Sequence, residues 1–219
     1  MLPRVKQKSN ILEIQIPCPH TSYLESLARK DSFEELWSLF RFADKPMKEL
    51  TESYSAYKHT GNWKKLEDLT VIHVGDGAHC RTGAMFALLT KHNNISIDPN
   101  INIALVNEWV TKFNIQRLKY YKGAWQDVIN FDNKVIRSNK ALLCFTHAHV
   151  NSWDVVTRCI ELGMNVVGAY VSACCQPNHQ LTLPVRQFDD WGILSPERTC
   201  QLWSNAFIPR EGWIIPVTE

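Results

Sequence analysis

The stretch VIHVGDGAHCRTGAMFALLTKHNNISIDPN, which runs from Val71 to Asn100, decides the fold. An apolar run ends at Gly75 and Gly77, a helix-like segment follows, and a second apolar run ends at Asp98. Glycines directly after a strand allow a sharp turn and let a ligand approach the main chain. The helix that follows directs free N–H groups at the same place. This order predicts a β-α-β unit with a nucleotide-type cofactor site.

The position of Asp98 supports this interpretation. An acid about 20 residues beyond the turn, at the end of the second strand, is placed to accept hydrogen bonds from ribose hydroxyls. A purely structural interpretation is also open. Two glycines form a tight turn without any ligand, and Asp98 followed by Pro99 is a good helix start.

From residue 70 onward, apolar strand-like segments alternate with amphipathic helix-like segments. Strands are predicted at TVIHVGD (70–76), NISIDP (94–99), IQRLKYYKG (115–123), KALLCFTHA (140–148) and MNVVGAYVSACC (164–175). Helices are predicted at GAMFALLTKH (83–92), NIALVNEWVTKF (102–113) and SWDVVTRCIELG (152–163). This alternation predicts an α/β fold, with a mostly parallel sheet and helices on both faces.

The two ends of the chain have a different texture. Residues 1–20 are predicted to be irregular and 21–69 helical, so we divide the chain into an N-terminal helical extension (1–66) and the sheet domain (67–219). Residues 184–207 are predicted to form either a strand, a turn and a second strand, or a loop and an edge pair. Within them, Asp189, Asp190 and Trp191 form either the lid of a pocket or a solvated acidic turn with Trp191 packed on the core.

Composition limits the class of protein. Of 219 residues, 45% are hydrophobic and 21% charged, which is typical of a globular chain. The net charge of +2 neither requires nor excludes nucleic acid. No apolar run approaches the ~20 residues of a membrane span, and no secretory signal follows the basic N-terminus. Seven scattered cysteines predict free thiols in a reducing, cytoplasmic compartment.

The glycine turn narrows the choice of cofactor. A dinucleotide fingerprint, GxGxxG, would need glycine where Cys80 stands, and the lysine-containing phosphate loop is absent. The order of strand, VGxG turn, helix, strand and acid resembles motif I of class I S-adenosylmethionine-dependent methyltransferases. The resemblance covers about residues 66–175. It implies a Rossmann-like, mostly parallel seven-stranded sheet, with S-adenosylmethionine or S-adenosylhomocysteine as the ligand.

The resemblance also implies site residues. The cofactor would be bound by a set comprising Gly75, Asp76, Gly77, His79, Asp98, Trp125 and Asp127. Asp127 would hold the adenine, with Ala124 and Trp125 lining the ring. Two positions depart from the family pattern, since His73 stands at the usual acid and His79 at a usual third glycine. Gly83 is expected to supply the close packing of the helix against the sheet.

Histidines mark the expected acceptor side of the site. His147 and His149 follow the fourth predicted strand, where one of them would serve as the general base that removes a proton from the acceptor. Two alternatives involve Cys174 as well: a zinc site formed with both histidines and His179, or a cysteine nucleophile. No metal is assigned. Cys80, beside an arginine near a helix N-terminus, is expected to be a mildly activated thiol.

Three functions remain open at this stage. The first is S-adenosylmethionine-dependent methyl transfer to an RNA, a protein or a small molecule. The second is a non-catalytic, methyltransferase-like binding module for a protein or nucleic-acid partner, which the departures at His73 and His79 favour. The third, an NAD-type oxidoreductase, is disfavoured by Cys80.

Overall fold

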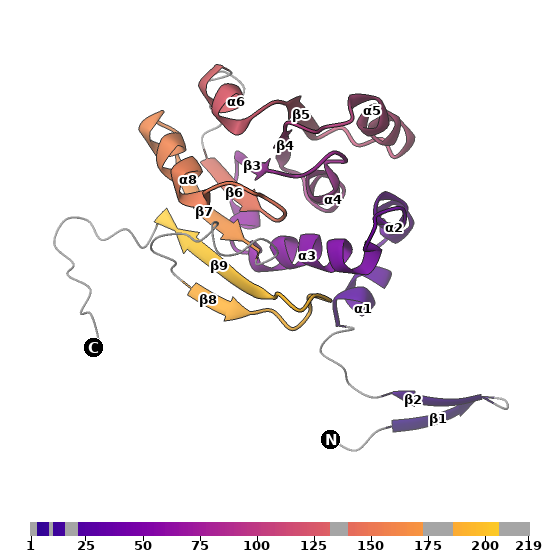
Figure 1. Ribbon diagram of the computed structural model, residues 1–219. Helices are drawn as coiled ribbons and strands as arrows, with labels where there is room; N and C mark the ends of the chain where they lie inside the picture. The colour runs from indigo at the N-terminus through magenta and orange to yellow at the C-terminus, as the bar shows by residue number, and fades with distance from the viewer. Residues whose placement is uncertain (1–3, 9–10, 16–21, 132–139, 173–185, 206–219) are drawn as a thin grey trace, which may run out of the picture.

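The computed structural model describes residues 4–8, 11–15, 22–131, 140–172 and 186–205. Seven strands of the described chain form one sheet in the order β5-β4-β3-β6-β7-β9-β8 (Figure 1). Their bounds are Leu69–Val74 (β3), Asn93–Asp98 (β4), Leu118–Lys122 (β5), Lys140–Phe145 (β6), Val166–Val171 (β7), Arg186–Asp189 (β8) and Thr199–Ser204 (β9).

The first five strands of this sheet are parallel, whereas β9 pairs antiparallel with both β7 and β8. The strand order reverses between β3 and β6, because the chain first adds strands on one side of β3 and then returns to the other side. In an open α/β sheet, ligands bind beyond the carboxyl ends of the strands at such a reversal. The structure confirms the predicted mostly parallel, seven-stranded Rossmann-like sheet.

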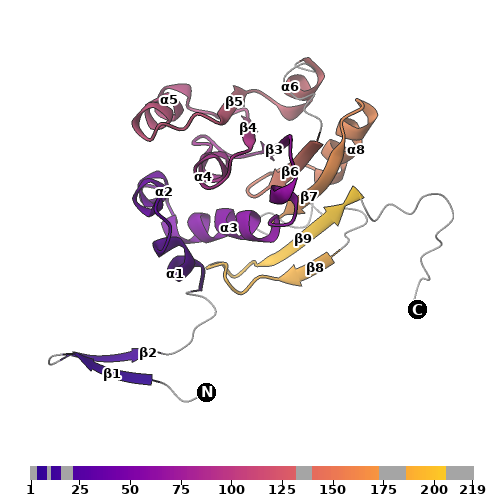
Figure 2. The same ribbon diagram turned by 180° about the vertical axis from the view of Figure 1, so that it is seen from behind.

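Each central strand is buried on both faces. Alternate side chains of a strand point to opposite sides of a sheet, so Leu69 and Val71 belong to one hydrophobic cluster and Ile72 and Val74 to the other. The first cluster also takes side chains from α4 (Arg81–Leu89) and α5 (Ile103–Lys112), the second from α6 (Trp125–Phe131) and α8 (Ser152–Glu161). Figures 1 and 2 show the resulting layers of helix, sheet and helix.

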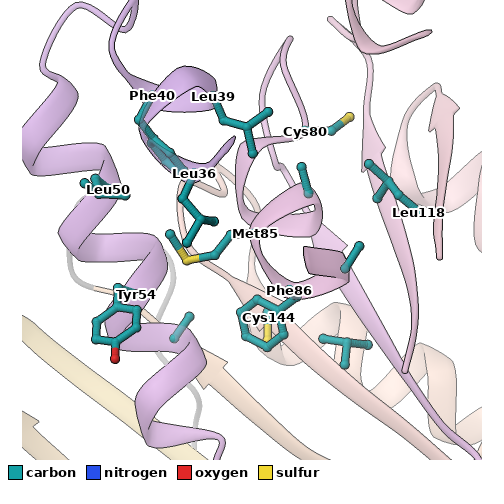
Figure 3. Close-up of a cluster of buried hydrophobic side chains, with 14 of the residues drawn as sticks. Leu36, Leu39, Phe40, Leu50, Tyr54, Cys80, Met85, Phe86, Leu118 and Cys144 are labelled. Atoms are coloured by element: carbon teal, nitrogen blue, oxygen red, sulfur yellow. The ribbon is translucent and has the colours of Figure 1, made fainter. Parts of the chain in front are cut away.

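The N-terminal helices share the first of these clusters. They are α1 (Ser22–Ala28), α2 (Phe33–Phe40) and α3 (Pro46–His59), followed by a short 3-10 turn, η2 (Trp63–Lys65). Figure 3 shows Leu36 of α2 directed at Met85 of α4, and Leu50 of α3 and Phe86 of α4 belong to the same cluster. The predicted helical extension is therefore packed into the core of the sheet domain.

Helix α3 is unusual because polar side chains lie on its buried surface. Pro46 at its start suits the fixed backbone angle of proline. Seven consecutive residues, from Leu50 to Ala56, are buried, and Glu52 and Ser55 are among them. Buried polar groups need partners. Glu52 is paired with Lys48 of the same helix, whereas Ser55 bonds to Asp190, which comes from a distant part of the chain.

Two expectations for the chain ends are wrong. Residues Arg4–Lys8 (β1) and Ile11–Gln15 (β2) form an antiparallel hairpin where irregular structure was expected. A hairpin forms when two short segments pair with each other. A search for helical periodicity does not detect such pairing. The solvated acidic turn is wrong as well: Asp190 is buried, and Trp191 is exposed beneath the Arg198 guanidinium.

Asp190 instead joins the last strands to the N-terminal helices. Its Oδ2 accepts hydrogen bonds from the hydroxyls of Tyr23 and Ser55, both at 2.5 Å, and lies 3.0 Å from Nε2 of His59. Burial acts to raise the pKa of Asp190. The bonds from His59, Ser55, Tyr23 and the Gly192 N–H outweigh burial and hold that pKa well below its usual range.

Candidate functional site

The glycine turn lies at the carboxyl end of β3, and both glycines have a left-handed backbone. Gly75 has φ 70° and Gly77 has φ 73°, a region that disfavours other residues. A Cβ on Gly75 would lie 2.6 Å from Cα of Ala148, so the loop after β6 presses on this turn. A Cβ on Gly77 would meet no described heavy atom within 4 Å. Space for a ligand is therefore found beside Gly77.

Asp76, between the two glycines, points into the protein. Its carboxylate accepts hydrogen bonds from the N–H groups of Thr82 and Gly83, at 3.0 and 2.9 Å, in the first turn of α4. Ser96 of β4 donates a third, at 2.6 Å. A carboxylate at a helix N-terminus stabilises the helix through its free N–H groups. Asp76 thus connects the turn to α4 and β4.

Gly83 lets α4 lie close to the sheet. A Cβ at this position would lie 2.2 Å from Oγ of Ser96 and 3.1 Å from Oδ2 of Asp76. The expected close packing through Gly83 is confirmed. Cys80, just before the helix, has φ 49° and is completely buried. Burial raises the pKa of its thiol, and the negative charge of Asp76 raises that pKa further. The expectation of an activated thiol is therefore wrong.

Asp98 lies at the same edge of the sheet as the turn. Its Oδ2 accepts a hydrogen bond from the N–H of Gly77 at 3.0 Å, and its Oδ1 accepts one from the N–H of Asn100 at 2.7 Å. The N–H of Gly75 in turn donates to the Ile97 carbonyl at 2.8 Å. The ends of β3 and β4 are therefore joined through the turn, with the carboxylate of Asp98 at its mouth.

A pocket of about 250 Å³ opens at this edge. It is lined by residues of the β3, β4, β5 and β6 ends: Val74, Gly75, Ile97, Asp98, Pro99, Asn100, Gly123, Ala124, Trp125, Gln126, His147, His149 and Val150. We call it the β-edge pocket. Predicted site residues that line it together are Gly75, Asp98, Ala124, Trp125, His147 and His149.

A second pocket, of about 440 Å³, lies on the other side of the glycine turn. Its lining residues come from the α2–α3 segment, the turn itself, α4 and the end of β6: Phe42, Ala43, Asp44, Lys45, Lys48, Glu49, Asp76, Gly77, Ala78, His79, Arg81 and His147. We call it the α3 pocket. His147 lines both pockets, so its imidazole stands at the boundary between them.

The surroundings of His147 set its charge. Burial lowers its pKa to about 4, and the positive charges of Lys48 and Arg81 act in the same direction. Its Nδ1 lies 3.6 Å from Oε2 of Glu52. Glu52 is completely buried, and burial raises its pKa to about 7 although the Lys48 ammonium lies 3.0 Å from Oε1. At neutral pH the imidazole is therefore uncharged and the carboxyl is close to its midpoint.

The two departures from the family pattern have different surroundings. His73 is fully buried, with Nε2 3.2 Å from Oδ1 of Asn94 and its ring edge-to-face with Phe86. Burial lowers the pKa of His73, which keeps it neutral. His79 is near Trp109 and lines the α3 pocket rather than the β-edge pocket.

Other predicted residues are separated from the β-edge pocket. Asp127 is exposed in the first turn of α6 and, among the described residues around the two pockets, lines neither. Its neighbour Gln126 lines the β-edge pocket instead. Cys174 and His179 lie outside the described residues. In the part that the structure describes, no three histidine, cysteine or acidic side chains gather as a metal site would require.

No family model matches the chain, and no curated protein matches it. Among solved structures, it is similar to a mutant of MtNAS in complex with S-adenosylmethionine, with a TM-score of 0.53 and 11% identity, over 84% of this chain and 70% of that chain. MtNAS in complex with MTA and tNA gives a TM-score of 0.53 and 12% identity, over 84% and 69%. An RNA methyltransferase from Salinibacter ruber in complex with S-adenosyl-L-homocysteine gives a TM-score of 0.48 and 13% identity, over 75% of this chain and 95% of that chain.

Sequence identities this low establish the fold alone. Numbered within the sheet, the strand order is 3-2-1-4-5-7-6, with the seventh strand antiparallel. The chain has the class I methyltransferase fold. Within the described residues, no helix is both long and apolar enough to cross a bilayer.

In this class I methyltransferase fold, the α3 pocket is the part that sequence reasoning missed. Its wall includes Lys45, Lys48 and Glu49, which come from the helical extension. A charged run at the start of a helix usually indicates a solvated face, so the local pattern gave no signal. Glu52 was missed for the same reason. Gln126 had a weak signal, because it lies in the segment KGAWQDV that was expected to contact the adenine.

Proposed function

We propose that this protein binds S-adenosylmethionine in the β-edge pocket and transfers its methyl group to an acceptor in the α3 pocket. One observation carries the proposal: at the strand reversal the N–H of Gly77 holds the carboxylate of Asp98 at 3.0 Å, and Asp98 lines the β-edge pocket. The similarity in fold to a structure that contains S-adenosylmethionine supports the same ligand.

The residues of the β-edge pocket fit an adenosyl group. A carboxylate offers about four lone-pair positions, and the two backbone N–H groups at Asp98 leave the others for ribose hydroxyls. Trp125 and Ala124 supply apolar surface for a planar ring, and Gln126 supplies an amide for its polar edge. Gly75 lines this pocket and has no side chain to keep a ligand from the main chain. Asp76 contributes indirectly, by holding the turn on α4.

When bound, S-adenosylmethionine supplies an electrophilic methyl group on a sulfonium. The protein's task is then to align the acceptor, to exclude water and to accept a proton. The imidazole of His147 is placed for this task because it borders both pockets and is uncharged at neutral pH. His149 lines only the β-edge pocket of the two, which favours His147 on the acceptor side.

Titration calorimetry with S-adenosylhomocysteine tests the proposal. We expect saturable one-site binding to the folded protein, and NAD as a control ligand is expected to bind far more weakly. Absence of heat with a folded sample at high concentration would remove the methyltransferase proposal. Binding of S-adenosylhomocysteine without methylation of any RNA, protein or small-molecule acceptor would favour the alternative, a methyltransferase-like binding module.

The cellular compartment also remains part of the proposal. Four cysteines of the described chain, Cys80, Cys144, Cys159 and Cys200, are buried and form no disulfide there. Reduced buried thiols support the prediction of a reducing, cytoplasmic environment.

A further inference from the structure

A buried carboxyl lies behind the wall of the α3 pocket and has no role in the site described so far. Glu52 belongs to α3, and its side chain is completely buried. Two of the pocket's lining residues separate it from the pocket: Lys48, 3.0 Å from Oε1, and His147, 3.6 Å from Oε2. Burying an ionised carboxylate costs several kcal/mol, so a chain that needed only packing would place an apolar side chain here.

We propose that Glu52 acts through His147 as the proton acceptor of the α3 pocket, so that the methyl acceptor is an amine or a hydroxyl group that loses a proton on transfer. This inference rests on the proposed methyl transfer. Glu52 is a positioning residue, because the imidazole and not the carboxylate borders the pocket.

The geometry supports a relay through the imidazole. Nδ1 of His147 faces Glu52, which favours the tautomer that carries its proton on Nδ1 and leaves Nε2 able to accept another. A separation of 3.6 Å is longer than a hydrogen bond. Such contacts commonly tighten when the substrate binds.

The proton inventory of this step is balanced. The acceptor nitrogen or oxygen forms the new bond to the methyl carbon with its own lone pair. The electron pair of the broken carbon–sulfur bond remains on sulfur. The acceptor's proton passes to Nε2 of His147, and the proton on Nδ1 passes to the carboxylate of Glu52, so no further reactant is needed.

The charges around the pair suit this role. The groups that act on Glu52 are Lys48 and Glu49 of its own helix and Glu197 of the segment before β9. The groups that act on His147 are Lys48, Arg81 of α4 and His149. With a pKa of about 7, Glu52 is a stronger base than His147, whose pKa is about 4, and it is matched to neutral pH. The imidazole alone would be a weak final acceptor.

The first test needs neither substrate nor cofactor. The protein is labelled on its eight histidines, and the His147 ring signal is assigned by its loss in a His147→Gln variant. We expect this signal to shift with an inflection near pH 7, which reports ionisation of Glu52, and to lose that inflection in Glu52→Gln. A His147 signal without an inflection within about one pH unit of neutrality in the unmodified protein, or one that persists in Glu52→Gln, would overturn the inference.

The second test uses the charge of the cofactor. S-adenosylmethionine carries a sulfonium, whereas S-adenosylhomocysteine does not. Ionised Glu52 therefore favours the former, and the ratio of their affinities is expected to rise severalfold as the pH increases from about 6 to about 8. The ratio is expected to stay flat in Glu52→Gln. If neither ligand binds, the proposed function fails; if both bind with a ratio independent of pH, only the role of Glu52 fails.

Discussion

The main-chain N–H of Gly77 donates to the Asp98 carboxylate across the ends of two adjacent parallel strands, at 3.0 Å. This contact holds the carboxylate at the mouth of the glycine turn, where it remains available to a ligand. It also means that Asp98 serves the turn even when no cofactor is bound.

Replacing Asp98 by alanine is expected to weaken S-adenosylhomocysteine binding roughly 10- to 100-fold, because hydrogen bonds to a charged group are each worth about 1.5–3 kcal/mol. Calorimetry measures the affinity. The control is Asp127→Ala, which removes an exposed carboxylate near the β-edge pocket and is expected to leave affinity within about twofold. Equal losses in both variants would show that general charge, and not the placement of Asp98, governs binding.

Gly83→Ala is expected to lower the free energy of unfolding by about 1–3 kcal/mol, because the new methyl group would lie 2.2 Å from Oγ of Ser96. The sign is opposite to intrinsic helix propensity, which favours alanine by about 1 kcal/mol. Urea unfolding measures the change. The control, Gly123→Ala, brings its Cβ no closer than 3.4 Å to Val128 and is expected to be nearly neutral. Stabilisation by Gly83→Ala would contradict the close packing of α4.

Asp190→Asn is expected to cost about 1–3 kcal/mol at neutral pH, because Tyr23, Ser55 and His59 lose a charged partner. The pKa of Asp190 is lowered in the folded protein, so its contribution is present above the ordinary value of 3.8 and is lost as pH falls further. As the pH is lowered below about 4, the free energy of unfolding should therefore fall less in the variant than in the unmodified protein. The control is the exposed neighbour Asp189→Asn, and equal effects of the two would contradict the assignment.

Glu52→Gln is expected to become more favourable for stability as the pH rises. The pKa of Glu52 is raised from 4.5 to about 7 in the folded protein, so its protonated form is stabilised there. The contribution of Glu52 to the free energy of unfolding is then largest below pH 4.5. It falls by on the order of 3 kcal/mol as the pH rises through about 7. Glutamine does not ionise, so this pH-dependent loss of stability is absent from the variant. The exposed Glu108→Gln is the control, and a difference between Glu52→Gln and the unmodified protein that does not vary from about pH 5 to about pH 8 would refute the shift.

A gain in stability at Glu52 would itself be informative. Residues that are unfavourable for folding are commonly retained where function needs them. A variant that is more stable above neutral pH but has lost the pH-dependent preference for S-adenosylmethionine would separate the two roles.

The local sequence determined the β-α-β unit and the place of its turn. Strand and helix periods are written in neighbouring residues, and the left-handed backbone at Gly75 and Gly77 is a requirement that glycine meets best. The same locality explains why Asp98 was found, since its position follows from where one strand ends. It also explains the error at Cys80, whose sequence neighbours suggest an activated thiol although tertiary packing buries it completely.

Tertiary structure alone decided the contacts of Glu52 with His147 and of Tyr23 with Asp190. The members of each pair are far apart in the chain. They meet because α1 and α3, which carry Tyr23 and Glu52, pack into the core of the sheet domain. In the sequence the polar residues of α3 resemble a solvated helix face. Burial raises the pKa of Glu52, and hydrogen bonds made in the packed protein lower the pKa of Asp190. Both effects are properties of the packed molecule rather than of any short stretch of residues.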